Sequence, residues 1–232
     1  GDGRDVTVDI AAGYLDYESS DPTVAQVNEL GKVTLIDAGS ATITAAFNGI
    51  AATGSLTITS LGDFDLPTAP PHAAADVISI FSDVYTNVNI DYYNGYWEPY
   101  QTTTSNDFDV NGDNILSYES FNFVGQQFSD PTVNASAMTH FHMDVYIPGT
   151  LAAGAQLKVT IKDFGANNKD GGGDDKTQAF TLTSADLSGD AWSSIDVALS
   201  LSSKNRVGQI IFENNGSNVT KLYMDNVYFY KQ

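Results

Sequence analysis

Apolar and polar residues alternate over short stretches along the whole chain, and turn residues separate these stretches. The clearest case is residues 138–148. One side of this stretch carries Phe141, Met143, Val145 and Ile147, and the other carries His140, His142, Asp144 and Tyr146. A period of two predicts a β-strand with one face in a core. Pro148 and Gly149 end the strand, because proline cannot donate a backbone hydrogen bond and glycine permits a turn.

The same alternation divides the chain into two regions of strands. Residues 5–60 contain short alternating runs, and Asn48-Gly49 is a strong hairpin signal. Residues 75–232 continue in the same way and predict an antiparallel sandwich. The last run changes parity between Met224 and Val227, so we expect a β-bulge at Asp225-Asn226. The predicted fold class is therefore all-β.

Residues 61–74 separate the two regions. They contain three prolines within five residues, at Pro67, Pro70 and Pro71. This composition predicts an extended linker of limited flexibility. His72 lies in this segment, and we expect it to be solvated. The expected domains are thus 1–60 and 75–232, joined by a linker over 61–74.

Composition narrows the possible partners. The formal net charge is −19, with only ten lysines and arginines in 232 residues. This balance argues against nucleic acid and anionic membranes, which bind through phosphate-neutralising cations. Cysteine is absent, which excludes disulfides and zinc–thiolate sites. The chain begins Gly1-Asp2-Gly3, so we expect a piece of a longer protein.

The first region resembles a known family. The segments 17–27, 31–33, 38–44 and 48–49 are similar in order to a bacterial immunoglobulin-like domain of group 2. This resemblance implies an N-terminal Ig-like β-sandwich over residues 1–60 that acts as a spacer. The region contains no histidine and shows no aromatic cluster that would suggest a binding site.

The second region resembles the jelly-roll carbohydrate-binding modules found beside laminarinases. The similarity is carried by residues 77–87, 123–126, 138–148, 158–165, 171–175, 192–199 and 222–229. It implies a C-terminal antiparallel β-jelly-roll sandwich that binds a polysaccharide, with Gln126 among the binding residues and Trp192 in a packing role. It also implies a structural calcium ion held by Asp83 and Asp225.

The pairing of the two domains resembles surface glycan-binding proteins of bacterial polysaccharide-utilisation systems. This implies an extracellular protein on the outer membrane, associated with a glycan importer. We expect a monomer.

An aromatic run in a predicted loop is the main binding candidate. Residues 91–100 contain Tyr92, Tyr93, Tyr96, Trp97 and Tyr100 without strand periodicity. Aromatic rings stack on the apolar face of a sugar while polar groups at their rim bind its hydroxyls. Trp97 is the first choice for such a ring.

The polar side of residues 138–148 admits three interpretations. His140, His142 and Asp144 could hold a metal ion, since histidine and carboxylate are common ligands. They could hydrogen-bond to sugar hydroxyls. They could also form a solvated or core-edge face without function.

Two acidic loops are ambiguous. Residues 107–113 resemble a calcium loop, but the twelfth position is Tyr118 or Ser120 in place of glutamate, which favours a β-turn. Residues 163–175 carry four aspartates and three consecutive glycines. They could form a calcium loop, a mobile hairpin tip, or the rim of a groove with Lys162, Asn167 and Asn168 as hydroxyl partners.

Three functions remain open at this point. The first is non-catalytic binding of a neutral glycan, with the β-1,3-glucan laminarin implied by the resemblance. The second is a jelly-roll lyase or hydrolase that uses His140, His142 or paired carboxylates. The third is a purely structural or adhesive tandem of β-domains. We expect no enzymatic activity.

Overall fold

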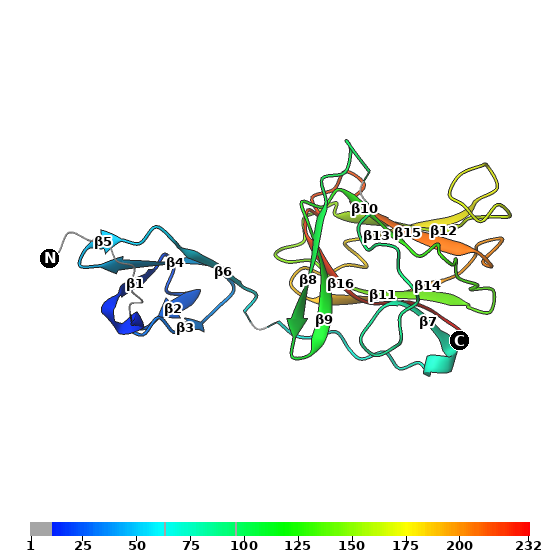
Figure 1. Ribbon diagram of the computed structural model, residues 1–232. Coiled ribbons are helices and arrows are strands. Elements are labelled where there is room, and N and C mark those ends of the chain that lie inside the picture. The colour runs from blue at the N-terminus through cyan, green and yellow to red at the C-terminus, as the bar shows by residue number, and fades with distance from the viewer. Residues whose placement is uncertain (1–10, 63, 96) are drawn as a thin grey trace. The chain divides into compact units, whose positions relative to one another are not determined.

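A computed structural model describes residues 11–62, 64–95 and 97–232. The chain forms two compact units, Gly1–Asp65 and Leu66–Gln232 (Figure 1). Both units consist of strands and turns with two short 3₁₀ helices among the described residues, η1 (Ala12–Tyr14) and η2 (Ala74–Asp76). The predicted all-β class is confirmed. The described residues include no helix of the length and apolar character needed to cross a bilayer.

Within residues 11–62, the first unit has two small antiparallel sheets. In one, β4 (Gly39–Phe47) pairs with β1 (Asp16–Ser19), β5 (Ile50–Ala51) and β6 (Leu56–Ser60). In the other, β2 (Ala25–Val27) pairs with β3 (Val33–Leu35). Asn48 and Gly49 both have positive φ, 48° and 77°, and form the expected hairpin turn between β4 and β5.

The core formed by the described residues of the first unit is small. Its buried cluster consists of Val24, Ala25 and Ala41, with Val33 packed against it. Several large apolar side chains of this unit remain exposed: Tyr14, Leu30, Leu35, Ile36, Phe47, Ile50 and Leu56. Most of the apolar burial in the described chain therefore lies in the second unit.

The second unit is a sandwich of two antiparallel sheets (Figure 1). The four-stranded sheet has the order β10 (Phe123–Gln127), β15 (Val207–Glu213), β12 (Gln156–Asp163) and β13 (Lys176–Thr183). The six-stranded sheet runs through β14 (Trp192–Ala198), β11 (His140–Tyr146), β16 (Leu222–Tyr230), β9 (Asp113–Glu119) and β8 (Thr104–Val110), and β7 (Val77–Phe81) also pairs with β16.

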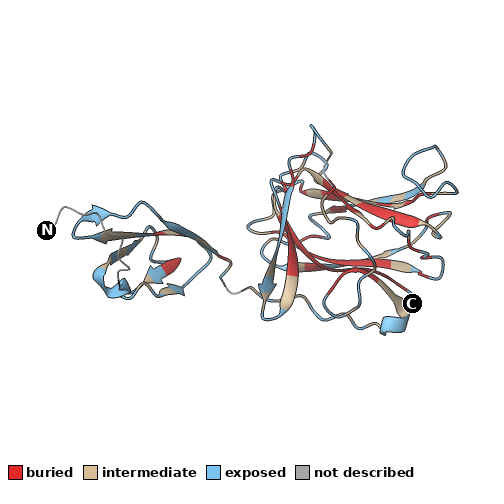
Figure 2. Ribbon diagram, in the orientation of Figure 1, coloured by how far each residue is buried: buried red, intermediate tan, exposed pale blue. Residues whose placement is uncertain are grey.

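One continuous core lies between these two sheets (Figure 2). Strand β12 contributes Leu157, Val159 and Ile161 from one sheet, and β11 contributes Phe141 and Val145 from the other. These side chains are buried because alternate residues of each strand point to the same face. The alternation read from the sequence in β11 and β12 is confirmed.

Strand β16 contains the expected bulge. Asp144 pairs with Asp225, whereas His142 pairs with Tyr228, so β16 has one residue more than β11 over this interval. Asn226 adopts a φ of 52°. The extra residue allows Met224 and Phe229 to enter the same core although their parity differs.

The segment before β7 belongs to the second unit. The hydroxyl of Tyr85 donates a hydrogen bond to the carbonyl of His72 at 2.8 Å, and the His72 ring stacks on Tyr230 with centroids 3.9 Å apart. The expectation that His72 is solvated is therefore wrong. Residues 66–74, which we expected to link two domains, pack against the second sandwich.

Candidate functional site

The outer face of the four-stranded sheet carries side chains aligned across all four strands. The register places Phe123, Glu213, Lys158 and Thr181 in one row, Gly125, Ile211, Thr160 and Ala179 in the next, and Gln127, Gln209, Lys162 and Thr177 in the third. We call these twelve residues the platform. The residues between them in β10, β15 and β12, such as Val124, Val159 and Ile210, are buried in the core, and in β13 Phe180 packs against it partly buried. Most of the β12 and β13 part of the platform is partly or fully exposed.

A loop lies along the β10 edge of the platform. The amide of Gln127 donates to the carbonyl of Tyr92 at 2.9 Å, and the amide of Gly95 donates to the carbonyl of Gly125 at 2.9 Å. The Tyr92 hydroxyl donates to Oε1 of Gln127 at 2.7 Å. These hydrogen bonds attach the first part of the aromatic run to the edge strand β10, shortly before Trp97 in the sequence.

Trp97 sits directly on β10. A Cβ atom built on Gly125 would lie 2.0 Å from Cη2 of Trp97, so a side chain at this position would displace the indole. The indole also stacks on Phe123, with centroids 5.8 Å apart and planes inclined by 28°. Trp97 remains partly exposed. Trp97, the first choice for a ring that stacks on a sugar, therefore lies on the platform, and the absence of a side chain at Gly125 leaves space for it.

Hydrogen-bonding side chains occupy the third row. Nε2 of Gln209 donates to Oε1 of Gln127 at 3.1 Å, next to the Tyr92 hydroxyl. Burial, together with the charges of Asp91 and Asp170, raises the pKa of Tyr92. Tyr92 is therefore neutral near pH 7 and can donate or accept hydrogen bonds.

Both lysines of the platform are paired with carboxylates. Nζ of Lys158 lies 2.7 Å from Glu213, and Nζ of Lys162 contacts Asp170 and lies 3.1 Å from Asp175. Burial acts to lower the pKa of Lys162, but its bonds to Asp170 and Asp175 outweigh this and raise it. The platform thus carries charges that are locally balanced.

The loop after β12 places further predicted residues beside Lys162. Oδ1 of Asn168 accepts a hydrogen bond from the Thr132 hydroxyl at 2.5 Å. Asn167 donates from Nδ2 to the Gly171 carbonyl at 3.1 Å, inside the loop. The structure therefore brings Tyr92, Trp97 and Lys162 to one face, whereas Asn168 contacts Thr132 and Asn167 supports the loop that pairs with Lys162.

Other predicted residues lie elsewhere. Tyr93 turns inward, where its hydroxyl donates to the carbonyl of Ile80 at 2.8 Å, and burial raises its pKa to about 12. Tyr100, by contrast, stays near Trp97: it is 77% exposed in the turn after Trp97, and its amide donates to the Trp97 carbonyl at 3.1 Å. Tyr96 lies outside the described residues. Trp192 lies on the opposite sheet, edge-on to Tyr146 at 5.6 Å, as its predicted packing role requires.

The prediction that Gln126 binds a ligand is wrong. Gln126 is fully buried, and its Nε2 donates to the Tyr118 hydroxyl at 3.1 Å in the core. The chain changes parity between Phe121, which is buried, and Phe123, which lies on the platform. A shift of one residue moves every following side chain to the other face, so Gln127 takes the position that we assigned to Gln126.

His140 and His142 lie on the outer face of the six-stranded sheet, away from the platform. We call this surface, with Asp144, Tyr228 and Tyr230, the histidine face. Nδ1 of His142 donates to Asp196 at 2.9 Å, and Nε2 lies 3.5 Å from Asp144. Burial acts to lower the pKa of His142, but the bonds and charges of Asp144 and Asp196 outweigh it and raise the pKa.

His72 and Tyr85, from the segments before and after β7, cover part of the histidine face. His72 stacks on Tyr230, and Tyr85 meets Tyr228 edge-on at 5.5 Å. His142, Asp144 and Tyr228 are consequently buried. Of the three interpretations drawn from the sequence, a packed core-edge face fits best, because a sugar could not reach His142.

Residues 107–113 form a turn, and a separate group of carboxylates surrounds Asp225. Residues 107–113 form the end of the β8–β9 hairpin, with positive φ at Asn111 and Gly112, as the β-turn interpretation requires. Burial raises the pKa of Asp225 to about 7, and the nearby carboxylates of Asp113, Asp144 and Asp83 contribute. In residues 11–62, 64–95 and 97–232, no three His, Asp or Glu side chains are arranged to hold a metal ion.

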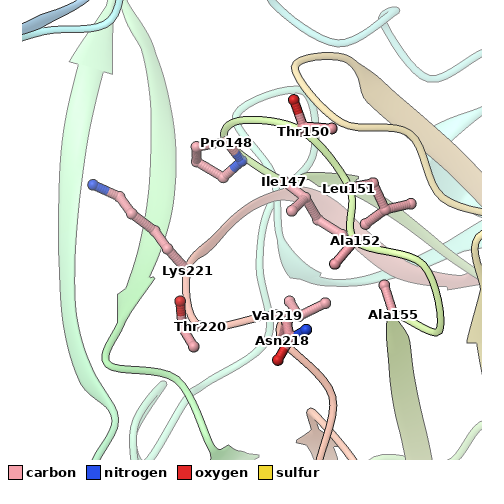
Figure 3. A pocket seen from close by; sticks show the side chains of 10 residues that line it. All are labelled: Ile147, Pro148, Thr150, Leu151, Ala152, Ala155, Asn218, Val219, Thr220 and Lys221. Atoms are coloured by element: carbon pink, nitrogen blue, oxygen red, sulfur yellow. The ribbon is translucent and has the colours of Figure 1, made fainter.

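A pocket at one end of the sandwich contains no platform residue (Figure 3). It is formed by residues 147–155 and 218–221, and Figure 3 shows Lys221 extending away from the other lining side chains. Lys221 pairs with Glu119 at 2.7 Å. Its lining offers neither an aromatic ring nor any predicted site residue.

One comparison with known protein families concerns the first unit. The family model described as "Intimin, immunoglobulin-like domain" matches residues 11–48. The expected Ig-like character of this segment is confirmed, whereas the assignment to group 2 stays a prediction. No curated protein matches the chain in sequence.

Several solved carbohydrate-binding modules are similar in structure. A family 30 module of a cellulosomal cellulase of Clostridium thermocellum is 12% identical, with a TM-score of 0.48, and the match covers 67% of this chain and 98% of that one. A family 11 module of Clostridium thermocellum, in complex with a β-1,3-1,4-mixed-linked tetrasaccharide, is 15% identical, with a TM-score of 0.38 and coverage of 60% and 86%. A family 28 module described as specific for non-crystalline cellulose is 15% identical, with a TM-score of 0.43 and coverage of 60% and 88%. These values are too low for the likeness to say what this chain binds.

The sequence interpretation missed most of the platform. Phe123, Gln127, Gln209 and Ile211 lie beside Trp97 and Tyr92 but were not among the expected binding residues. The usable signal was the alternation of Gln209 and Ile211 with the core residues Ile210 and Phe212. Alternation shows that these residues face away from the core, but only the strand order brings them beside β10.

Proposed function

We propose that the second unit binds a neutral polysaccharide on the platform without catalysis. The observation that carries this proposal is the placement of the partly exposed rings of Trp97 and Phe123 next to the amide of Gln127, which the buried Gln209 holds in place, on a partly open sheet face. Aromatic rings can stack on the C–H face of a sugar, while amides exchange hydrogen bonds with its hydroxyls. This combination suits carbohydrate better than an apolar or highly charged ligand.

The size of the platform supports an extended ligand. Residues two apart in a strand are separated by roughly 6.6 Å and neighbouring strands by about 4.8 Å, so three rows across four strands measure roughly 13 by 14 Å. This exceeds a single sugar ring. The carboxylates paired with Lys158 and Lys162 leave no unbalanced positive charge on the platform, and this favours a neutral chain over an anionic one.

Laminarin is the specific ligand that we propose, from the resemblance to modules beside laminarinases. We extend the proposal to a monomer on the outer bacterial surface that delivers glycan to an importer. In this scheme the Ig-like unit is a spacer. Each of these finer statements is separable from polysaccharide binding itself.

A calcium ion bound by Asp83 and Asp225 is a further part of the proposal. Carboxylate oxygens are the ligands that calcium prefers. The chemistry of the site is compatible, because Asp225 is buried near the carboxylates of Asp113 and Asp83 and its pKa is raised to about 7. A cation there would offset the repulsion between these groups.

The test is affinity electrophoresis of the full chain against gels that contain laminarin, mixed-linkage glucan, cellulose derivatives or no glycan. We expect retardation in at least one neutral glucan gel, with laminarin giving the largest effect. Equal mobility in all gels would contradict polysaccharide binding and favour a structural role. A reducing-end assay on the same glycans tests the alternative lyase or hydrolase, and release of new ends would establish it.

A further inference from the structure

A chain of polar side chains crosses the core of the second unit beneath the platform. Nε2 of Gln126, from β10, donates to the Tyr118 hydroxyl, from β9, at 3.1 Å. The Tyr118 hydroxyl donates to the carbonyl of Tyr93 at 2.6 Å. Gln126 and Tyr118 are both fully buried. The polar chain therefore links one sheet to the other and ends on the backbone of the aromatic loop.

A chain of polar side chains inside a core lowers the free energy of unfolding unless all of its groups are hydrogen-bonded. A buried polar group costs free energy unless it is fully hydrogen-bonded. Oε1 of Gln126 has no hydrogen-bond partner in the described part of the protein. Apolar residues of similar shape would fill the same space without this cost. Stability alone therefore does not explain why this position holds glutamine opposite tyrosine.

The polar chain ends at the Tyr93 carbonyl, in the loop that holds Tyr92 and leads to Trp97. Tyr93 follows Tyr92 directly, and Tyr92 binds Gln127 on the platform. Two residues further on, Gly95 donates to the carbonyl of Gly125 at 2.9 Å, the glycine on which the Trp97 indole sits. The Tyr93 ring is itself held in the core by Ile80 and by an edge contact with Phe81 at 5.3 Å. A shift of the Tyr93 backbone would move both Tyr92 and the segment that leads to Trp97.

We propose that Tyr118 and Gln126 are positioning residues for the polysaccharide site, acting through the Tyr93 carbonyl. This inference rests on the proposed function for its binding readout. They do not touch the ligand. They fix the height and direction of the aromatic loop relative to β10, so that Trp97 and Tyr92 are preorganised before a glycan arrives. Preorganised contacts bind more tightly because less ordering is needed on association.

The decisive variant is the double substitution Tyr118→Phe with Gln126→Leu, which removes the two polar side chains and frees the Tyr93 carbonyl. We expect the thermal midpoint to change little, since removal of the unpaired Gln126 oxygen offsets the loss of the hydrogen bond to this carbonyl. We expect polysaccharide binding to weaken about three- to tenfold, the factor equivalent to the net free energy of one ordinary hydrogen bond. A purely structural role predicts the opposite pattern, in which stability falls and binding per folded molecule is unchanged.

A second readout does not depend on any glycan. In a Trp192→Phe background Trp97 is the sole tryptophan. We expect its emission to shift and its quenching by acrylamide to rise in the double variant. The single variant Tyr118→Phe, which is nearly isosteric, serves if the double variant does not fold. The matched control is Tyr228→Phe, which removes another fully buried hydroxyl that contacts no part of the loop.

The outcomes separate the two proposals. Unchanged affinity and unchanged Trp97 emission in a folded variant would overturn the positioning role. If the wild-type chain binds no polysaccharide, the proposed function fails, and the emission and quenching of Trp97 still decide whether Tyr118 and Gln126 hold the loop.

Discussion

The two outer faces of the second sandwich start from the same pattern and end differently. Strands β12 and β11 both alternate core residues with polar ones. The polar residues of β12 lie on a partly open platform, whereas on β11 His142 and Asp144 are buried, and only His140 and Tyr146 at the strand ends stay partly exposed. The comparison teaches that alternation identifies the face that points away from the core. Whether that face meets solvent depends on segments far away in the chain.

On the histidine face, the charged side chains have fixed partners within the protein. His142 has carboxylate partners on both sides, Asp196 at 2.9 Å and Asp144 at 3.5 Å, and its ring stacks on Tyr228. Such fixed partners suit a packed face. On the platform, Trp97 and the exposed threonines of β13 leave surfaces that a ligand can reach.

Gly125→Ala is expected to have the largest effect on the difference between the platform and the histidine face. Its new Cβ would lie 2.0 Å from the Trp97 ring, so the indole must move off β10. We expect glycan binding to weaken more than tenfold, since stacking on one aromatic side chain is worth roughly 1–3 kcal/mol in nucleic-acid systems. Affinity electrophoresis measures this. Gly54→Ala is the control, because nothing lies within 4 Å of its Cβ position, and equal losses in both variants would count against the placement of Trp97.

Calcium is expected to stabilise the side of the sandwich that carries the histidine face without altering the platform. At a hundredfold excess over its dissociation constant, an ion that binds only the folded state adds roughly 2.7 kcal/mol to the free energy of unfolding. Thermal melting with calcium and with chelator measures the effect. Asp225→Asn should abolish the difference, whereas a midpoint that ignores calcium in the wild type would remove the proposed ion.

Without calcium, the raised pKa of Asp225 also predicts a pH dependence. A carboxyl whose pKa is about 7 in the folded state and 3.8 in the unfolded state binds more protons when folded. Its contribution therefore makes the free energy of unfolding fall as the pH rises from about 4 to 7. Calcium should reduce this slope, which denaturant titrations at several pH values can measure.

His142 is a base whose protonated form is stabilised in the folded protein, so it adds to the free energy of unfolding at low pH. Its pKa is raised in the folded state, so its contribution is fully present below the unfolded value of 6.5 and is lost as the pH rises through the folded value. We expect Asp196→Asn to destabilise the protein by only about 0–1 kcal/mol at pH 6, because the lost charge is half-exposed and Asn can still accept the hydrogen bond of His142, and to leave glycan affinity unchanged. Lost binding in a folded Asp196→Asn variant would mean that the histidine face is part of the site.

The smallest effect is expected from the ion pair on the platform. Lys158 and Glu213 are each 35% exposed in their side chains, and such surface pairs are worth about 0–1 kcal/mol. The double variant Lys158→Met with Glu213→Gln should keep its melting temperature within a few degrees. Binding of a neutral glycan should also be insensitive to salt between low and high ionic strength, and a steep salt dependence would point to an anionic ligand instead.

Strand positions were largely predictable from the sequence because they depend on local periodicity. The β11 and β12 core faces and the bulge at Asn226 followed from which residues share a parity. The error at Gln126 came from a parity change near Asn122, where that side chain hydrogen-bonds with the Tyr100 and Thr102 backbone rather than continuing the alternation. Nothing local in the sequence marks this change.

The site was only partly predictable for a related reason. Trp97 could be chosen from its loop composition, but its seat on Gly125 and its neighbours Gln127 and Gln209 depend on strand order. The cover over the histidine face likewise depends on distant segments: His142 stacks on Tyr228, and His72 packs on Tyr228 and Tyr230. Composition identified the chemistry, and tertiary packing decided which residues it brought together.

The most direct test of the central claim compares Trp97→Ala with Trp192→Ala in one experiment. Each variant is measured for its melting temperature and for its retardation in a laminarin gel and in the other glucan gels. The account predicts that Trp97→Ala loses retardation and keeps most of its stability, whereas Trp192→Ala keeps its retardation. Retained binding by a folded Trp97→Ala variant, with binding lost in Trp192→Ala, would contradict the account and place the site on the opposite sheet.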